Sequence, residues 1–114
     1  MASGEATASA KWSPKRRTEL ARRSEALVAT LLEKRGFEIL GCNVRVGRLE
    51  LDVVARRGAL VVVCEVRSRT KGDPVHPAET IDRKKLERVR RATAIWLREQ
   101  KLGRVRARID AAAV

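Results

Sequence analysis

Aromatic residues are scarce in this sequence, and their scarcity limits how the protein can fold and what it can bind. They make up 3% of the 114 residues, as Trp12, Phe37 and Trp96, with no tyrosine. The core must therefore be built from leucine, valine, isoleucine and alanine. Binding of single-stranded nucleic acid by base stacking needs several exposed rings, so the composition argues against that mode of recognition.

Cysteine and histidine are equally rare. Cys42 and Cys64 fall in predicted strands at a spacing that matches no zinc pattern, so we expect two buried free thiols in a reducing compartment. His76, the single histidine, lies in a predicted loop, where a surface position is more common than a catalytic role. The sequence also lacks an apolar run of membrane-span length and a signal-peptide pattern, which predicts a cytoplasmic protein without a membrane segment.

Acidic residues are outnumbered by basic ones. The 26 lysines and arginines against 14 acids give a formal net charge of +12 and a pI near 11.2. Such a balance favours a polyanionic partner, with nucleic acid the first candidate and an anionic membrane surface the rival.

The length and the charge pattern divide the chain in two. Residues 1–17 are small, polar and then basic, and we expect a disordered arm that either adds phosphate attraction or only aids solubility. Residues 18–114 are the right size for a single domain. Their pattern predicts helices over 18–35 and 80–101, strands over 37–45, 59–66 and 104–111, a further strand from Leu49 to the turn at Arg57-Gly58, and a loop over 70–79.

The stretch from Leu49 to Arg69 carries the charges of greatest interest. It is predicted to form two strands joined by a turn at Arg57-Gly58. On the first strand, alternation predicts that Glu50 and Asp52 share one face, while the other face carries Leu49, Leu51 and Val53.

The second of these strands ends in charge. Leu60 to Cys64 are all apolar, which indicates a central strand covered on both faces, and Glu65 follows directly. A carboxylate in that position is costly to bury alone, so it needs a cation, a metal or an opening at the strand end. With Asp52 and Arg67 it would suit a divalent cation and a phosphate; the alternative is a set of solvated ion pairs.

Both helices present charges toward the predicted sheet. On the first, an apolar arc is expected to face the sheet, with Glu25 just beyond its edge; the arc comprises Leu20, Leu27, Val28, Leu31 and Leu32. On the second, Lys85 lies within the inner arc, whereas Lys84 lies nearly opposite. The outer face of this second helix carries a dense basic run, which favours contact with phosphates over a merely solvated surface.

The order and spacing of these segments resemble the YraN-like family of small uncharacterised bacterial proteins. The similarity rests on Glu25 with the following LLEKRG, Asn43-Val44-Arg45, Glu50-Leu51-Asp52, Glu65 to Arg69, Lys85, and Arg108-Ile109-Asp110, and it spans roughly Glu25 to Asp110. The family is related to archaeal Holliday-junction resolvases. The resemblance implies an α/β fold with the restriction-endonuclease-like αβββαβ core, a mixed sheet flanked by helices, within the PD-(D/E)xK superfamily.

The resemblance also implies a metal-dependent endonuclease acting on DNA, including branched DNA. Asp52 and Glu65 would hold Mg²⁺ or Mn²⁺, with the Val66 carbonyl as a further ligand, and Glu25 would orient the attacking water. The related resolvases act as dimers, which implies a homodimer, although the sequence identifies no dimer surface. Phosphate contacts are expected from Arg45, Arg69, Arg83, Lys84 and Arg88.

Three positions depart from the family pattern. Ser24 and Leu49 replace glycines, and Arg67 replaces the catalytic-type lysine. Arginine keeps its proton, so Arg67 could clamp the phosphate but could not act as a proton carrier, and Lys85 is a hypothetical substitute in that role. Two alternatives to a nuclease therefore stay open: a DNA-binding module without turnover, and a basic protein that binds an acidic protein.

Overall fold

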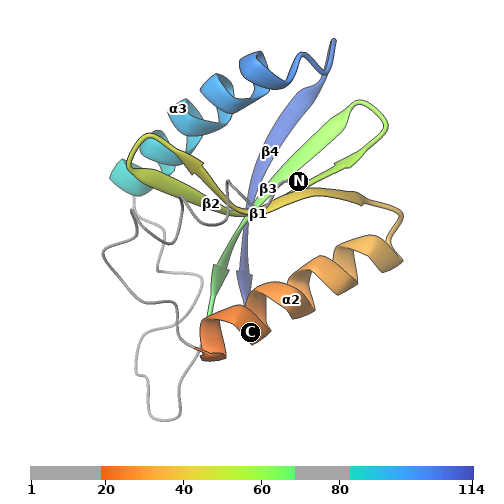
Figure 1. The fold of residues 1–114 in the computed structure, drawn as a ribbon, viewed down its shortest axis with the longest axis vertical. Helices are drawn as coiled ribbons and strands as arrows, with labels where there is room; N and C mark the ends of the chain where they lie inside the picture. The colour runs from red at the N-terminus through yellow and green to blue at the C-terminus, as the bar shows by residue number, and fades with distance from the viewer. Residues whose placement is uncertain (1–18, 69–82) are drawn as a thin grey trace.

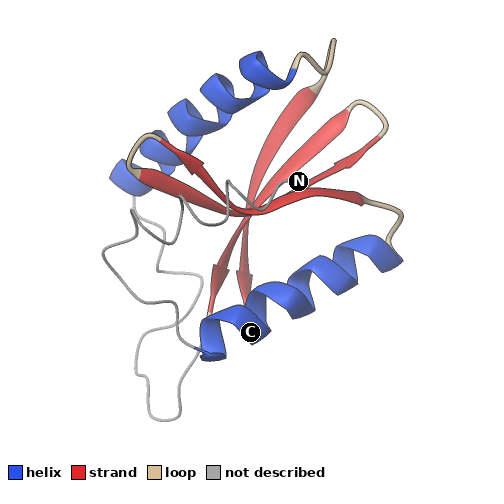
Figure 2. Ribbon diagram, in the orientation of Figure 1, coloured by secondary structure: helices blue, strands red, loops and turns tan. Residues whose placement is uncertain are grey.

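The chain folds into a four-stranded mixed sheet with one helix on each face. The computed structural model describes residues 19–68 and 83–114. Along the chain the elements are α2 (Glu19–Lys34), β1 (Glu38–Val46), β2 (Leu49–Arg57), β3 (Leu60–Arg67), α3 (Arg83–Gln100) and β4 (Arg106–Ala113). Figure 1 shows α2 and α3 on opposite sides of the sheet, and Figure 2 shows the same layers by element type. The predicted αβββαβ order and fold class are confirmed, while the predicted arm over residues 1–17 and loop over 70–79, with His76, lie outside the described residues.

The strands are arranged in the order β1-β2-β3-β4. The pairs β1–β2 and β2–β3 are antiparallel, and β3–β4 is parallel. Residues Val61 to Val63 of the inner strand β3 are completely buried. This confirms the prediction that the apolar run would be covered on both faces, because α2 and α3 each supply one cover.

Each face of the sheet has its own core. On the α3 side, the packed residues are Leu51, Val54, Val61, Val63, Val89, Ala92 and Trp96. On the α2 side they are Val28, Phe37, Val53, Ala55, Val62 and Cys64. As the composition predicted, aliphatic residues make up most of both clusters, with one ring in each.

The alternation of β2 breaks at Asp52. Leu51 packs on the α3 side, whereas Val53 packs on the α2 side, so the prediction that these two residues share a face is wrong. In β1, Asn43 stands between Cys42 and Val44, which pair with Val53 and Leu51, and it adopts a left-handed φ of 54°. Asparagine tolerates this region better than most residues. The hairpin is therefore kinked next to Asp52.

Helix α2 is rotated from the orientation that its leucines predict. Val28 is only 5% exposed, but Leu27 is 47% exposed, and Leu20 and Leu31 are exposed as well. The residues buried against the sheet are instead Ser24, Glu25 and Val28. The predicted apolar arc is therefore wrong in part: Val28 is buried as predicted, but the helix turns Ser24, which is bonded to Ser68, toward the sheet in place of the exposed leucines.

The end of α2 is fixed by two contacts. Gly36, at a φ of 87°, closes the helix, with its N–H donating to the Glu33 carbonyl and the N–H of Phe37 donating to the Leu32 carbonyl. Arg57, at the end of β2, donates to the Arg35 carbonyl at 2.8 Å and lies over the Phe37 ring. The helix end is thereby attached to the sheet.

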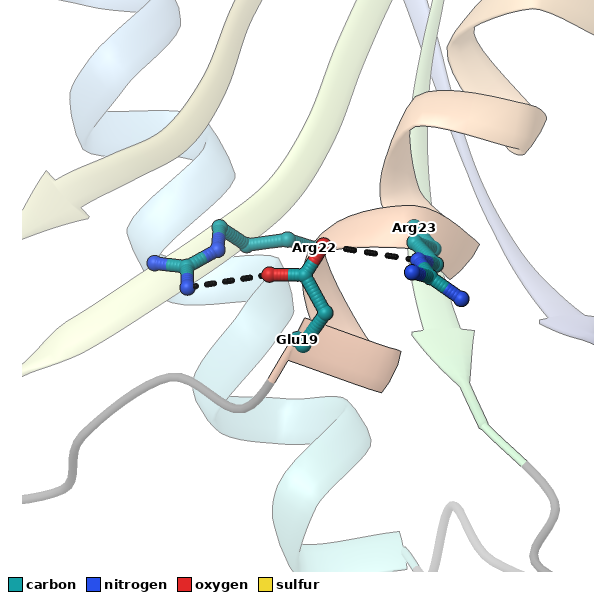
Figure 3. A network of polar contacts seen from close by, with 3 residues as sticks. All are labelled: Glu19, Arg22 and Arg23. Carbon is teal, nitrogen blue, oxygen red and sulfur yellow. Dashed lines mark hydrogen bonds and ion pairs between the residues drawn. The ribbon is translucent and has the colours of Figure 1, made fainter.

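The first turn of α2 carries a cluster of surface charges. Glu19 lies between Arg22 and Arg23, with an oxygen to nitrogen distance of 3.3 Å to each (Figure 3). These side chains are exposed, so the pairs add little stability. Within the two described segments, no helix is both long and apolar enough to cross a membrane.

The two cysteines differ from each other. Cys64 is buried, and burial is the main reason that the pKa of its thiol is raised to about 11. Cys42 is exposed, so the prediction of two buried thiols is wrong for this residue. Cys42 belongs to the edge strand β1, so it is less covered than its register partner Val53, which is buried on the inner strand β2. Both cysteines are free.

The rotation of α2 can be tested by paired truncations. Val28→Ala should lower the free energy of unfolding by roughly 1–3 kcal/mol, because it removes buried methyl groups and leaves a cavity. Leu27→Ala, the matched control on the exposed side, should cost less than about 1 kcal/mol. Urea unfolding followed by circular dichroism measures both values. An equal or greater loss for Leu27→Ala would contradict the orientation described above.

Candidate metal and nucleic-acid site

Asp52 and Glu65 lie where strands β2 and β3 separate. The last pair of the ladder at this end is Val53 with Cys64, so each acid comes one residue beyond it. Two crossed hydrogen bonds replace the ladder: the N–H of Val66 donates to Asp52 Oδ2 at 2.8 Å, and the N–H of Asp52 donates to Glu65 Oε2 at 3.4 Å. The separation of the strands thus brings the two carboxylates together.

Glu65 is a buried acid with a perturbed titration. Its residue is 4% exposed, and its pKa is raised to about 7, first by burial and then by the negative charge of Asp52. The hydrogen bond from the main chain of Asp52 and the charge of Lys85 oppose this rise, and the charge of Glu25 adds to it. Both burial and the charge of Asp52 disfavour the ionised form of Glu65, and a cation bound beside the two acids would favour it.

Lys85 brings a positive charge to the acids from α3. Its Nζ lies 3.9 Å from Glu65 Oε1, and its side chain is 41% exposed. The structure therefore places Lys85 on the inner side of α3, as the helical pattern predicted, while Lys84 is exposed. The ammonium reaches the site from the solvent edge, in the way that long basic side chains commonly do.

Glu25 approaches the same acids from α2. It is 6% exposed, so it lies deeper than the edge position predicted for it. The neighbouring Ser24 accepts a hydrogen bond of 2.7 Å from the hydroxyl of Ser68, just after β3. This bond ties the first half of α2 to the end of the strand that carries Glu65, and it explains how Glu25 is held close to the sheet.

Asn43 is a feature that the sequence reasoning did not assign to the site. Its Oδ1 is buried without a hydrogen-bond partner among the described residues. By register it stands opposite Asp52, between the pairs Cys42–Val53 and Val44–Leu51. The signal available in the sequence was an asparagine within a predicted strand, a residue that is uncommon there and that tolerates a left-handed backbone.

The arginines have different surroundings from one another. Arg45 lies 3.5 Å from Glu50, and both are half-buried, so Glu50 belongs to this pair. Arg67 is exposed at the end of β3, whereas the cation at ion-pair distance from Glu65 is Lys85. On α3, Arg83, Lys84 and Arg88 are exposed. Arg69 lies outside the described residues.

The donor set is suited to an ion that keeps much of its water. Over residues 19–68 and 83–114, no three histidine, cysteine, aspartate or glutamate side chains gather closely enough to hold a metal by themselves. Asp52 and Glu65 together offer two carboxylates, the number that Mg²⁺ commonly takes from a protein while retaining waters. Val66, whose carbonyl the resemblance implied as a further ligand, is in contact with this pair through its N–H, which donates to Asp52.

The element order and the paired acids define the class of the protein: it has the restriction-endonuclease-like αβββαβ core. Comparison with known proteins identifies the particular family. Residues 24–114 match the family described as "Uncharacterised protein family UPF0102". The chain belongs to this family, which is the YraN-like family that the motifs resembled.

Individual relatives agree with this assignment. A UPF0102 protein of Paenarthrobacter aurescens (strain TC1) is 41% identical over 95 residues, which cover 83% of this chain and 78% of the relative. A UPF0102 protein of Sorangium cellulosum (strain So ce56) is 44% identical over 101 residues, covering 86% of this chain and 70% of the relative. A third, from Leifsonia xyli subsp. xyli (strain CTCB07), is 40% identical over 83 residues, covering 73% and 70%.

The raised pKa of Glu65 predicts a pH dependence of stability. A folded-state pKa of about 7, above the ordinary value of 4.5, means that the folded protein binds more protons than the unfolded chain between these two values. Stability supplied by this group should therefore be present below about pH 4.5 and be lost as the pH rises through about 7. Relative to Glu65→Gln, the wild type should lose on the order of 2 kcal/mol between about pH 5 and pH 8. Urea unfolding at several pH values measures this, and parallel curves for the two proteins would contradict it.

A divalent cation bound by Asp52 and Glu65 should offset the loss of stability that ionised Glu65 causes at high pH. At about pH 8 and at roughly ten times its dissociation constant, Mg²⁺ should add about 1.4 kcal/mol to the stability of the folded state. The thermal shift should disappear in Asp52→Asn and persist in Asp110→Asn, because Asp110 pairs with Arg108 on β4, at an oxygen to nitrogen distance of 3.0 Å. Equal shifts in both variants would show that the ion binds elsewhere.

Proposed function

We propose that this protein is a Mg²⁺- or Mn²⁺-dependent endonuclease that cuts DNA, including branched DNA. The observation that carries the proposal is the buried Glu65. It lies beside Asp52 where β2 and β3 separate, and it is within ion-pair distance of Lys85. A buried carboxylate beside a second, half-buried one is costly to a fold, and such perturbed groups concentrate at functional sites. The net charge of +12 supports a polyanionic substrate.

Each residue of the site has a distinct role in this proposal. Asp52 and Glu65 would hold the divalent ion, which when bound supplies Lewis acidity toward a phosphodiester. Glu25 would orient the attacking water from the α2 side. Lys85, whose ammonium faces Glu65, would hold a proton near the reacting phosphate and stabilise its growing negative charge.

The exposed basic residues would position the DNA. Arg83, Lys84 and Arg88 line the outer part of α3, so they are accessible to a phosphate backbone. Arg67 stands exposed at the end of β3, two residues after Glu65, where it would clamp the phosphate that is cut. Half-buried Arg45 would contribute from β1, and Arg69 would extend the series.

A DNA-binding module without turnover is the second candidate, and one observation favours it. The two acids already accept hydrogen bonds from the main chain, and Lys85 already supplies a positive charge beside Glu65. Arg67, in place of a lysine, cannot give up a proton during the reaction. A site satisfied in this way could retain its acids for structure alone.

Cleavage by wild type and Asp52→Asn distinguishes these candidates. The wild type should cut a labelled four-way junction or a matched duplex in Mg²⁺ or Mn²⁺ but not in EDTA. Asp52→Asn should lose at least about 100-fold in rate, because an active-site ligand is removed, while its DNA affinity stays equal or increases. Asp110→Asn is the matched control and should cut normally.

Three other results would change the conclusion. Salt-sensitive binding of DNA without any cutting would favour the binding module, and cutting by Arg67→Lys alone would identify the arginine as the cause. Cutting that is equal in wild type and Asp52→Asn would contradict the assigned site. Binding to DNA that does not weaken steeply with salt would contradict the nucleic-acid function itself and leave the acidic-protein partner.

A further inference from the structure

A groove beside the acidic site combines arginines with an exposed apolar surface. It has a volume of about 650 Å³ and lies between α3 and the turn that joins β1 to β2. Its basic lining consists of Arg45, Arg48, Arg88 and Arg91. We call it the hairpin groove. Its size is in the range of small-molecule binding sites, and one nucleotide would fit within it.

The apolar part of the hairpin groove is unusual in its setting. Ile95 is 44% exposed although it lies among arginines, and Val46 and Leu49 extend the apolar surface across the hairpin. A purely ionic ligand would pair with the arginines but would not bury the apolar surface of Ile95. The lining therefore fits a ligand with negative charge and a flat apolar part, and guanidinium groups can stack on such a part as well as pair with phosphate.

The position of the groove connects it to the acids. Arg45 pairs with Glu50, which precedes Asp52 by two residues on β2. Arg88 follows Lys85 by three residues on α3, so it lies on the next turn of the same helix, and Lys85 reaches Glu65. A DNA backbone that runs from the acids along α3, from Lys85 toward Arg88, would therefore reach the hairpin groove.

We propose that the hairpin groove binds an unpaired nucleotide of the DNA substrate, with its phosphates on Arg88 and Arg91 and its base against Ile95. The inference rests on the proposed function and specifies the substrate: DNA with an unpaired nucleotide next to the cut site. In a continuous duplex the bases are stacked inside, so the apolar surface would have nothing to cover. Few aromatic rings are needed, because one nucleotide requires one surface rather than a stacking platform for a long strand.

One carboxylate restricts where the phosphates can lie. Glu99 also lines the hairpin groove, one turn beyond Ile95 on α3. Its charge would repel phosphate at that end, whereas Arg88 lies at the end nearest the acids. The nucleotide is therefore oriented with its phosphates toward Lys85 and its base toward Ile95 and Glu99, whose carboxylate can accept a hydrogen bond from an amino group of the base.

Binding to three labelled DNAs tests the proposal. They are a blunt duplex, the same duplex with a short unpaired flap, and that duplex with an abasic flap of the same length and charge. In EDTA, fluorescence anisotropy should show wild type binding the flap about tenfold more tightly than the abasic flap, a difference of about 1.4 kcal/mol. The preference should vanish in Ile95→Ser, while Arg91→Gln should weaken all three complexes and lower the salt dependence by about one phosphate contact.

Matched controls lie on exposed positions away from the groove. Leu27→Ser removes an equally exposed apolar side chain from α2, and Arg98→Gln removes an exposed arginine from α3; both should keep the flap preference. Equal binding of the normal and abasic flaps, or an unchanged preference in Ile95→Ser, would overturn the inference. So would displacement of the flap by a polyglutamate peptide as effectively as by unlabelled flap DNA, which would indicate an acidic protein as the occupant.

Because these measurements contain no metal, they separate this inference from the proposed function. Tight, flap-selective binding without cleavage would support the inference about the hairpin groove and contradict only the proposed nuclease activity. Cleavage that needs Asp52 but shows no flap preference would defeat only the groove.

Discussion

The crossed hydrogen bonds between Asp52 and Glu65 are the constraint on which the rest of this structure depends. Strands β2 and β3 pair normally up to Val53 and Cys64 and then separate, and the two carboxylates accept the main-chain N–H groups that the ladder leaves behind. An unpaired N–H group in this position would be costly, so the acids stabilise the end of the sheet as well as forming a site. The cost appears in Glu65, whose pKa burial and the charge of Asp52 raise to about 7.

The two helices respond to that constraint in different ways. Helix α3 brings Lys85 to Glu65, which reduces the negative charge of the site. Helix α2 brings another acid, Glu25, and does so at the expense of its leucines, three of which are 41–47% exposed while Ser24 and Glu25 are buried. Apolar burial alone would have turned α2 the other way. The bond between Ser24 and Ser68, together with the small size of Ser24, is the local interaction that opposes that rotation.

Much of this arrangement could be predicted from the sequence because it depends on local patterns. The uninterrupted run from Leu60 to Cys64 predicted a strand buried on both faces, and Glu65 directly after it indicated an acid that needed a partner. The helical period placed Lys85 on the inner side of α3. The orientation of α2 could not be predicted in this way, because it depends on contacts such as the bond between Ser24 and Ser68, which lie far apart in the chain and outweigh the local periodicity. The exposure of Cys42 could not be predicted either. The left-handed backbone at Asn43, in contrast, had a signal in the sequence, an asparagine within a predicted strand.

Sequence and structure also differ in which basic side chain they place next to Glu65. Alternation predicts that Arg67, two residues after Glu65, shares its face of the strand, but Arg67 is exposed, while Lys85 reaches the carboxylate from a different element. Arginine holds its proton and spreads its charge over a planar fork, which suits the proposed clamp on the phosphate that is cut, whereas the lysine ammonium is a compact charge beside the carboxylate. In the proposed nuclease, Arg67 would thus supply the phosphate clamp and Lys85 the positive charge beside the acids. This division of roles would also explain how an arginine can occupy the strand position while the acids keep their proposed role in metal binding.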